Sequence, residues 1–178
     1  MVRWLWYFLI YSFLGYCLEK VYAFATHSPH QVRKCFLLLP LCPVYGLAMS
    51  ACLAWIPLDS SFFLQVIAGG LICTTVEYLV HWYYDLVFSV RFWDYSAQRG
   101  NIRGRICPQF ALVWGFLSAL TLRWLQPVIA VIVQQIPPAL TFAAWMLLIT
   151  DCVLTWPLLR RYQDTELLTI SAVLAHMQ

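Results

Sequence analysis

Long apolar runs constrain this chain more than any other feature. Several of them reach the roughly 18–20 residues that a helix needs to cross a bilayer. The 178 residues are 62% hydrophobic and only 11% charged, whereas a soluble domain carries about a quarter charged residues. The chain has too few polar groups to cover a water-facing surface. The sequence therefore predicts an all-α, polytopic transmembrane helical bundle that lies in the lipid bilayer.

We expect five spans, over residues 4–25, 35–55, 62–90, 110–136 and 139–159. Pro40 and Pro43 remove backbone donors near the start of the second span, so that span should begin as a broken or re-entrant piece. Pro137 and Pro138 predict a tight turn before the fifth span. Residues 1–163 then form a single transmembrane domain. Residues 164–178 form a short cytoplasmic tail with the apolar pattern of a surface helix.

Basic residues predict the orientation of the chain. Arg33 and Lys34 lie in the first loop, four arginines lie in or beside the third, and Arg160 and Arg161 follow the last span. With five spans these segments share one side, and Arg3 is the only exception near a span end. The positive-inside rule then places the N-terminus outside and the C-terminus in the cytoplasm, in the cell membrane.

The first apolar segment ends in a sequence that resembles a signal-peptide cleavage site, Ala23-Phe24-Ala25. Glu19 and Lys20 interrupt the apolar run just before it, so we favour a retained first helix. The seven cysteines form no CxxC pair, which argues against both a disulfide framework and a zinc site. We expect them to pack as small hydrophobic side chains.

The charged residues within the expected spans include Glu19, Glu77, Asp85, Arg123 and Asp151. A charge at bilayer depth costs a few kcal/mol on insertion scales, so such residues usually face a cavity or a partner. One alternative is that Arg123 pairs with Glu77 or Asp151 and only holds the bundle together. For Glu19 and Glu77 we favour a functional role.

Glu77, His81 and Asp85 are spaced i, i+4 and i+8, which places them along one face of a helix. Such a row could hold a metal or relay a proton. Three residues on one helix cannot surround an ion, however, and no second His or Cys cluster completes the set. We therefore expect no metal, and a structural histidine that bonds to its neighbours.

The segment FWDYSAQRGNIRGRICPQ, residues 92–109, is the one polar stretch between apolar runs. Positive-inside topology explains its arginines but not Asp94 and Asn101 among them. Gly100 and Gly104 permit tight turns. We predict a folded cytoplasmic cap over the bundle, reaching back toward three acidic residues, Glu19, Glu77 and Asp85.

Arg103 and Arg105 flank Gly104 within this segment. In an extended segment both side chains would project to the same side. Two guanidinium groups so placed would make a fork for phosphate or carboxylate.

Four stretches carry a resemblance to a known family. They are YSFLGYCLEKVY (11–22), FLLLPLCPVYG (36–46), EYLVHWYYDLVFSVRFWDYS (77–96) and NIRGRIC (101–107). In this order they resemble the bacterial ABC-transporter type IV family of CmpB-like permeases, over nearly the whole chain. The resemblance implies motif positions at Glu19, Pro43, Tyr45, Gly46, Glu77, Trp93, Asp94, Tyr95, Ser96, Asn101, Gly104, Arg105, Cys107 and Asp151. The chain departs from the family pattern at Leu39, usually Gly, and at Asp85, where Glu is common; His81 and Arg123 do not look like family features.

The leading interpretation is a permease-like component of a transporter for a small solute. The substrate or gating candidates are Glu19, Tyr45, Glu77, Asp85, Asp94, Asn101, Arg103 and Arg105. The chain has no GxxxxGK[ST] motif, so the family implies a separate ATPase subunit, and a pore of five spans implies a homo-oligomer or another partner. We expect no cofactor and no nucleic acid.

Two alternatives stay open. In the first, the chain is a membrane enzyme or binding protein for a lipid or polyprenyl phosphate. Arg103 and Arg105 would hold the phosphate, and Asp94 or Glu19 would act as general base. In the second, it is a structural or regulatory membrane subunit whose charges lock helices together.

Overall fold

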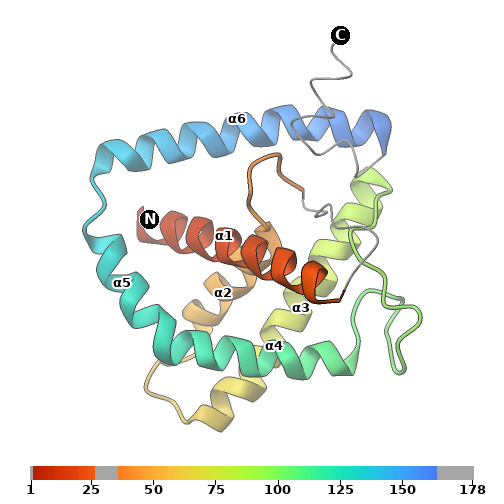
Figure 1. Cartoon of the computed structure of the whole chain (residues 1–178), viewed down its shortest axis with the longest axis horizontal. Coiled ribbons are helices and arrows are strands. Elements are labelled where there is room, and N and C mark those ends of the chain that lie inside the picture. Colours follow the sequence, from red (N-terminus) through yellow and green to blue (C-terminus); the bar gives the residue numbers. More distant parts are fainter. Residues whose placement is uncertain (1, 27–35, 164–178) are drawn as a thin grey trace.

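The computed structural model describes residues 2–26 and 36–163, and every regular element in these ranges is helical. The elements are α1 (Val2–Ala25), α2 (Pro43–Trp55), α3 (Phe62–Phe88), α4 (Pro108–Leu120), the π-helical turn η1 (Thr121–Leu125), α5 (Gln126–Gln134) and α6 (Pro138–Tyr162). Figure 1 shows α1 crossing between α6 and α4, with the α3–α4 connection at one end. The predicted all-α class is confirmed. The tail at 164–178, predicted to be a surface helix, lies outside the described residues.

Four helical stretches are long and apolar enough to cross a membrane: α1, α3, α4 continued through α5, and α6. The expected second span is different, because α2 has 13 residues and rises only about 20 Å. The preceding residues 36–42 are not helical, which is the break that Pro40 and Pro43 predicted. Pro43 occupies the first turn of α2, where a missing N–H costs nothing.

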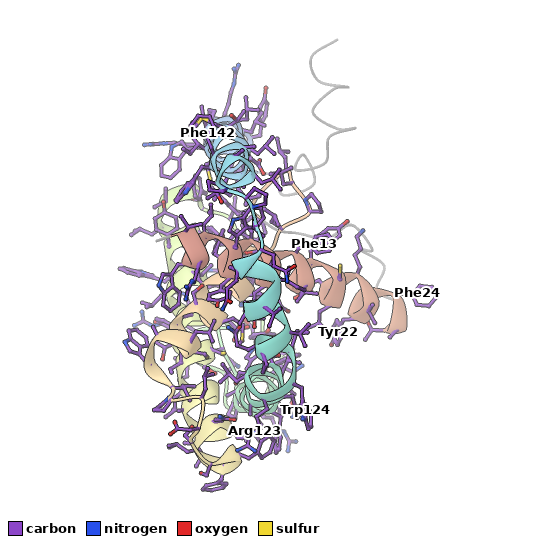
Figure 2. The ribbon with its side chains drawn as sticks, turned by 90° about the vertical axis from the view of Figure 1, so that its left-hand side faces the viewer. Phe13, Tyr22, Phe24, Arg123, Trp124 and Phe142 are labelled. Carbon is purple, nitrogen blue, oxygen red and sulfur yellow. The ribbon has the colours of Figure 1, made fainter. Side chains whose placement is uncertain are left out.

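Large apolar side chains cover much of the outer surface of the bundle. Phe24 of α1, Trp124 of η1 and Phe142 of α6 are each at least two-thirds exposed, and Figure 2 shows them on different sides of the molecule. An aqueous protein rarely exposes apolar surface on this scale. This surface is that of a protein embedded in a bilayer.

The core lies where α1, α2 and α3 meet η1 and α5. Tyr11, Met49, Cys52, Cys73 and Leu122 are among its buried residues. Gly46 permits the close approach of α2 to α1, because a Cβ there would collide with the Ser12 side chain and the Phe8 carbonyl. Small residues at such contacts let membrane helices pack tightly.

The fourth span is bent, whereas we expected a continuous helix over 110–136. Pro127 has no N–H to donate to the Arg123 carbonyl four residues earlier. The Gln126 N–H bonds to Thr121, five residues back, which makes the π-helical turn. Figure 1 shows the chain changing direction here between α4 and α5. The predicted turn at Pro137 and Pro138 follows, and α6 begins at Pro138.

Helix α6 is hydrogen-bonded to the rest of the fold near its start and near its middle. The Trp6 indole of α1 donates to the Thr141 hydroxyl at 3.0 Å. Near the middle of α6, the Asp151 carboxylate accepts the backbone N–H groups of Leu38 and Leu39 at 3.0 and 2.9 Å. An apolar groove of about 470 Å³ lies beside this second attachment, lined by α1, α2, α3, α6 and the segment that precedes α2.

The contacts of Asp151 correct one expectation and explain another. The carboxylate does not pair with Arg123; it also accepts the Thr155 hydroxyl at 2.9 Å. It thus satisfies backbone donors that the non-helical segment 36–42 would otherwise leave unpaired at bilayer depth. Cys42 in this segment is disulfide-bonded, which the cysteine pattern did not predict, whereas the other five described cysteines are free.

Candidate functional site

A compact polar cap, residues 89–107, connects α3 to α4. Ser89 ends α3 in the left-handed conformation. The Tyr95 N–H then donates to the Gly104 carbonyl at 2.7 Å, and the Ile102 N–H to the Ile106 carbonyl at 2.9 Å. These bonds fold the segment back on itself, as predicted for the cap. Cys107 is buried and immediately precedes α4.

Asn101 ties the cap together. Its amide nitrogen donates to the carbonyls of Ser96 and Gln98 at 3.2 and 2.7 Å. Its amide oxygen accepts the Gly104 N–H at 2.9 Å. Because these bonds engage both polar atoms of its amide, Asn101 serves the fold of the cap and offers little to a ligand.

Asp94 closes the turn that begins the cap. Its Oδ1 accepts the N–H and the hydroxyl of Ser96 at 2.8 and 2.5 Å. These hydrogen bonds hold the pKa of Asp94 below its usual value, because they favour the charged form. Gly104 packs directly on this turn with φ +67°, a conformation that glycine adopts without steric cost.

Arg105 joins the cap to α3. Its Nη2 donates to Asp85 at 2.9 Å and its Nη1 to the Tyr78 hydroxyl at 3.2 Å. The bond to Asp85 raises the pKa of Arg105, and Arg91 lies 3.5 Å from the other Asp85 oxygen. Arg105 is only 9% exposed, so its charge is committed to this pair.

The predicted fork of Arg103 and Arg105 is wrong. Residues 102–106 form a tight turn closed by pairing of Ile102 with Ile106, and not the extended segment that the fork requires. Arg103 adopts φ +54° and is exposed, whereas Arg105 is buried against Asp85. This arrangement removes the phosphate clamp on which the lipid-phosphate enzyme depended.

His81 also contacts the cap. Its Nε2 lies 3.0 Å from the Trp93 carbonyl, and the two rings meet edge to face. The Trp93 indole in turn donates to the Arg105 carbonyl at 3.0 Å. No group of three potential ligands that could hold a metal occurs among the described residues. These contacts agree with a histidine bonded to its neighbours.

Beneath the cap, two intramembrane acids lie in a cluster of aromatic side chains. Glu77 is 6% exposed and accepts hydrogen bonds from the Tyr95 hydroxyl at 2.9 Å and the Trp114 indole at 3.1 Å. Glu19 accepts the Tyr45 hydroxyl at 2.6 Å. The edge-to-face contact of Tyr45 with Trp114, at 5.5 Å, connects the two acids. We call Glu19, Tyr45, Glu77, Tyr95 and Trp114 the acid–aromatic cluster.

As predicted, the cap contacts two of the three acids: Tyr95 bonds to Glu77, and Arg105 bonds to Asp85. Glu19 joins through Tyr45 and Trp114. Burial, followed by the Glu77 carboxylate, raises the pKa of Tyr95, so its hydroxyl stays a proton donor. Both salt bridges within residues 2–26 and 36–163 involve Asp85, and neither Glu19 nor Glu77 has a basic partner in these ranges. The cluster can accept a proton or a cation.

Arg123 bonds to neither of its two expected partners, Glu77 and Asp151. Its Nε donates to Gln65 at 3.0 Å and its Nη2 to the Ser60 carbonyl at 3.1 Å. Pairing with Glu77 or Asp151 is therefore wrong, since Glu77 lies three turns of α3 beyond Gln65.

The sequence analysis did not identify three side chains in the spans that form hydrogen bonds. Trp114 and Tyr78 are aromatic residues in apolar runs, where nothing marks an indole or hydroxyl as a hydrogen-bond donor. Gln65 is uncharged, yet it is fully buried. An uncharged amide in a predicted span is itself a signal, because it needs a partner inside the bilayer.

The helices and their exposed apolar surface define a polytopic helical membrane protein with a folded polar cap. A family model described as "Putative ABC-transporter type IV" matches residues 6–156. The chain belongs to this family, as the four stretches quoted above led us to expect. No curated protein and no solved structure matches the chain.

Proposed function

We propose that the chain is the membrane-embedded component of a transporter, in which the acid–aromatic cluster contacts the solute or a coupling proton and the cap gates access to it. The observation that carries this proposal is the hydrogen bond from Tyr95 of the cap to Glu77 of α3. It links a polar segment outside the bilayer to a buried acid inside it.

The chemistry of the cluster favours a cationic solute. Two carboxyl groups that have no basic partner among residues 2–26 and 36–163 attract positive charge, and the aromatic faces of Tyr45 and Trp114 add cation–π attraction. In the closed cap, Tyr95 occupies one Glu77 oxygen. Lifting the cap withdraws that hydroxyl and leaves an oxygen free for a cation or a proton.

The cap also fits a role as the contact for a separate ATPase. Arg91, Arg99 and Arg103 are exposed on it, whereas Arg105 turns inward. A partner that binds this surface would act on Glu77 through Tyr95. We include in the proposal a homo-oligomer, because one chain supplies few spans for a pore, and a single transmembrane domain over 1–163.

We further propose that the cap and the C-terminus face the cytoplasm and the N-terminus the outside. Phe88 at the end of α3 packs against Trp156 of α6 at 4.9 Å, and Leu159 joins the same apolar cluster. The arginines of the cap therefore lie at the same end of the bundle as Arg160 and Arg161, which supports the positive-inside assignment.

The experiment starts with gentle purification from native membranes and mass spectrometry of the proteins that accompany the chain. We expect an ATPase with a Walker A motif. Solutes that accumulate in cells producing the chain are then compared with those in cells lacking it. Glu77→Gln should abolish the difference, and Tyr95→Phe, which removes only the hydroxyl, should reduce it. Tyr83→Phe, at an exposed position of the same helix, is the matched control.

The structural or regulatory subunit is the second candidate, because the bonds of Asp94, Asn101 and Arg105 all lie within the protein. It predicts a different pattern. Asp85→Asn would loosen the cap and release the partner protein, while Glu77→Gln in correctly folded protein would leave both solute content and partner binding unchanged. That result would overturn the transporter proposal.

A further inference from the structure

A second polar region lies at the end of α3 remote from the cap. The loop between α2 and α3 meets η1 and α5 there, around a pocket of about 440 Å³. Leu58, Asp59, Ser60, Arg123, Trp124 and Pro127 line it. Figure 2 shows Arg123 and Trp124 together near the N-terminal end of α3. None of these residues belongs to the acid–aromatic cluster.

Arg123 is held in position before any ligand arrives. Gln65 accepts from its Nε, the Ser60 carbonyl accepts from Nη2, and the Phe62 ring lies 5.5 Å from the guanidinium carbon. The fully buried Gln65 is itself fixed by its bond to the Leu58 carbonyl at 3.1 Å. These contacts leave Nη1 without a hydrogen bond among the described residues, and Arg123, in the π-helical turn, is one of the residues that line the pocket. Turns of this kind are frequent at functional sites.

Asp59 lines the same pocket but does not pair with Arg123. It is exposed, and within the described residues it has neither a salt bridge nor a hydrogen bond. A purely structural latch between the loop and η1 accounts for the Gln65 and Ser60 contacts, yet it gives Asp59 no role. Two opposite charges that face one pocket without neutralising each other are complementary to a ligand that carries both charges.

Two exposed tryptophans favour a headgroup level for this pocket. Trp124 and Trp55 are 70% and 72% exposed and lie at the same end of the bundle as the α2–α3 loop. Tryptophan is enriched at the membrane–water interface. The pocket thus combines apolar side chains, among them Leu58 and Trp124, with the charged side chains of Asp59 and Arg123.

We propose that this pocket binds a zwitterion, with its anionic group on Arg123 and its ammonium group on Asp59. Arg123 offers the guanidinium that suits phosphate or carboxylate. Two sources share this chemistry: the phosphoethanolamine headgroup of a membrane lipid, and a free amino acid or phosphoethanolamine in solution. The site is separate from the proposed function and stands without it.

The lipid arm uses the full chain in nanodiscs of equal phosphatidylethanolamine and phosphatidylglycerol, followed by native mass spectrometry of the lipids that stay bound. The wild type should retain phosphatidylethanolamine preferentially. Asp59→Asn should reduce this preference roughly fivefold, the factor given by about 1 kcal/mol from a partly exposed ion pair. Arg123→Gln should lower retention of both lipids. Arg3→Gln, at an exposed arginine of α1, is the matched control.

The soluble arm titrates detergent-purified protein with phosphoethanolamine, glycine and inorganic phosphate. The signal is the change in tryptophan fluorescence on adding ligand. The change that comes from the pocket is the part that the wild type shows and Trp124→Phe lacks. Saturation by the zwitterions but not by phosphate, without lipid preference, would assign the site to a free solute. The proposal would be overturned if the protein preferred neither lipid and the soluble ligands gave no Trp124-dependent signal. It would also be overturned if Asp59→Asn kept the lipid preference of the wild type; this side chain is exposed, so its replacement should not disturb the fold.

Discussion

Replacing Gly104 by alanine tests whether the cap is held by the turn at Asp94. A Cβ on Gly104 would lie 2.5 Å from the Ser96 hydroxyl and 2.6 Å from Asp94 Oδ1. Gly100 offers a matched control, because it has a similar φ of +72° but its Cβ would first meet Pro108 at 3.2 Å. The two substitutions differ mainly in what the added methyl displaces.

The magnitude follows from this difference. The left-handed conformation costs an alanine about 1–2 kcal/mol, and both variants bear that cost. Only Gly104→Ala must also push Ser96 and Asp94 aside to make room for the methyl group, and overpacking of this kind costs about 1–3 kcal/mol. The free energy of opening the cap should therefore fall further in Gly104→Ala, by roughly that amount.

Hydrogen exchange followed by mass spectrometry measures this opening directly. Peptides covering residues 93–107 contain the Tyr95 and Ile102 amides that close the cap. Their exchange in Gly104→Ala should be roughly fivefold to a hundredfold faster than in Gly100→Ala. Equal exchange rates in the two variants would show that the packing of Gly104 against Asp94 does not hold the cap closed.

Three further outcomes are expected. Asp94 is stabilised in its charged form, so the unfolded cap binds its proton more readily. The contribution of this carboxylate is present above the usual pKa of aspartate and is lost as the pH falls through the lower pKa of the folded cap. Hydrogen exchange of the cap amides should therefore become faster in acid than the intrinsic pH dependence of amide exchange accounts for. Asp94→Asn should lack this additional acceleration. Asp151→Ala should unprotect the Leu38 and Leu39 amides, with a local cost of about 1–3 kcal/mol; protection unchanged from the wild type would contradict the capping role. The Cys52 and Cys73 sulfur atoms lie 3.7 Å apart, so a membrane-permeant thiol oxidant should join α2 to α3 in the wild type but not in Cys73→Ser, as seen by peptide mapping.

Sequence predicted the parts of this fold that depend on spacing and chemistry along a single segment. The helical spans follow from apolar length. The break before α2 follows from Pro40 and Pro43, and the cap follows from an unexplained mixture of acid, amide and arginine. The i, i+4, i+8 row of Glu77, His81 and Asp85 does face one structure, the cap.

The errors concern partners that are far apart in the chain. For Arg123 the sequence suggests acidic partners, because opposite charges are an obvious match. Nothing in the sequence marks a neutral amide such as Gln65 as the partner of an arginine. The fork at Arg103 failed because one residue in the left-handed conformation turns the chain, and nothing in the residue type Arg marks such a position. Asp151 was recognised as costly in the bilayer, but its partners are backbone N–H groups, which carry no sequence signature.

The Asp151 contacts also set an order for the assembly of the protein. Leu38 and Leu39 precede Asp151 by 113 and 112 positions, so the ribosome makes the segment 36–42 long before it makes its acceptor. Until α6 enters the membrane, the two backbone N–H groups have to stay near water or be shielded by another protein. Helix α6, which is synthesised after α2, thus completes the placement of α2, and a nascent chain that stops before Asp151 leaves α2 without this anchor.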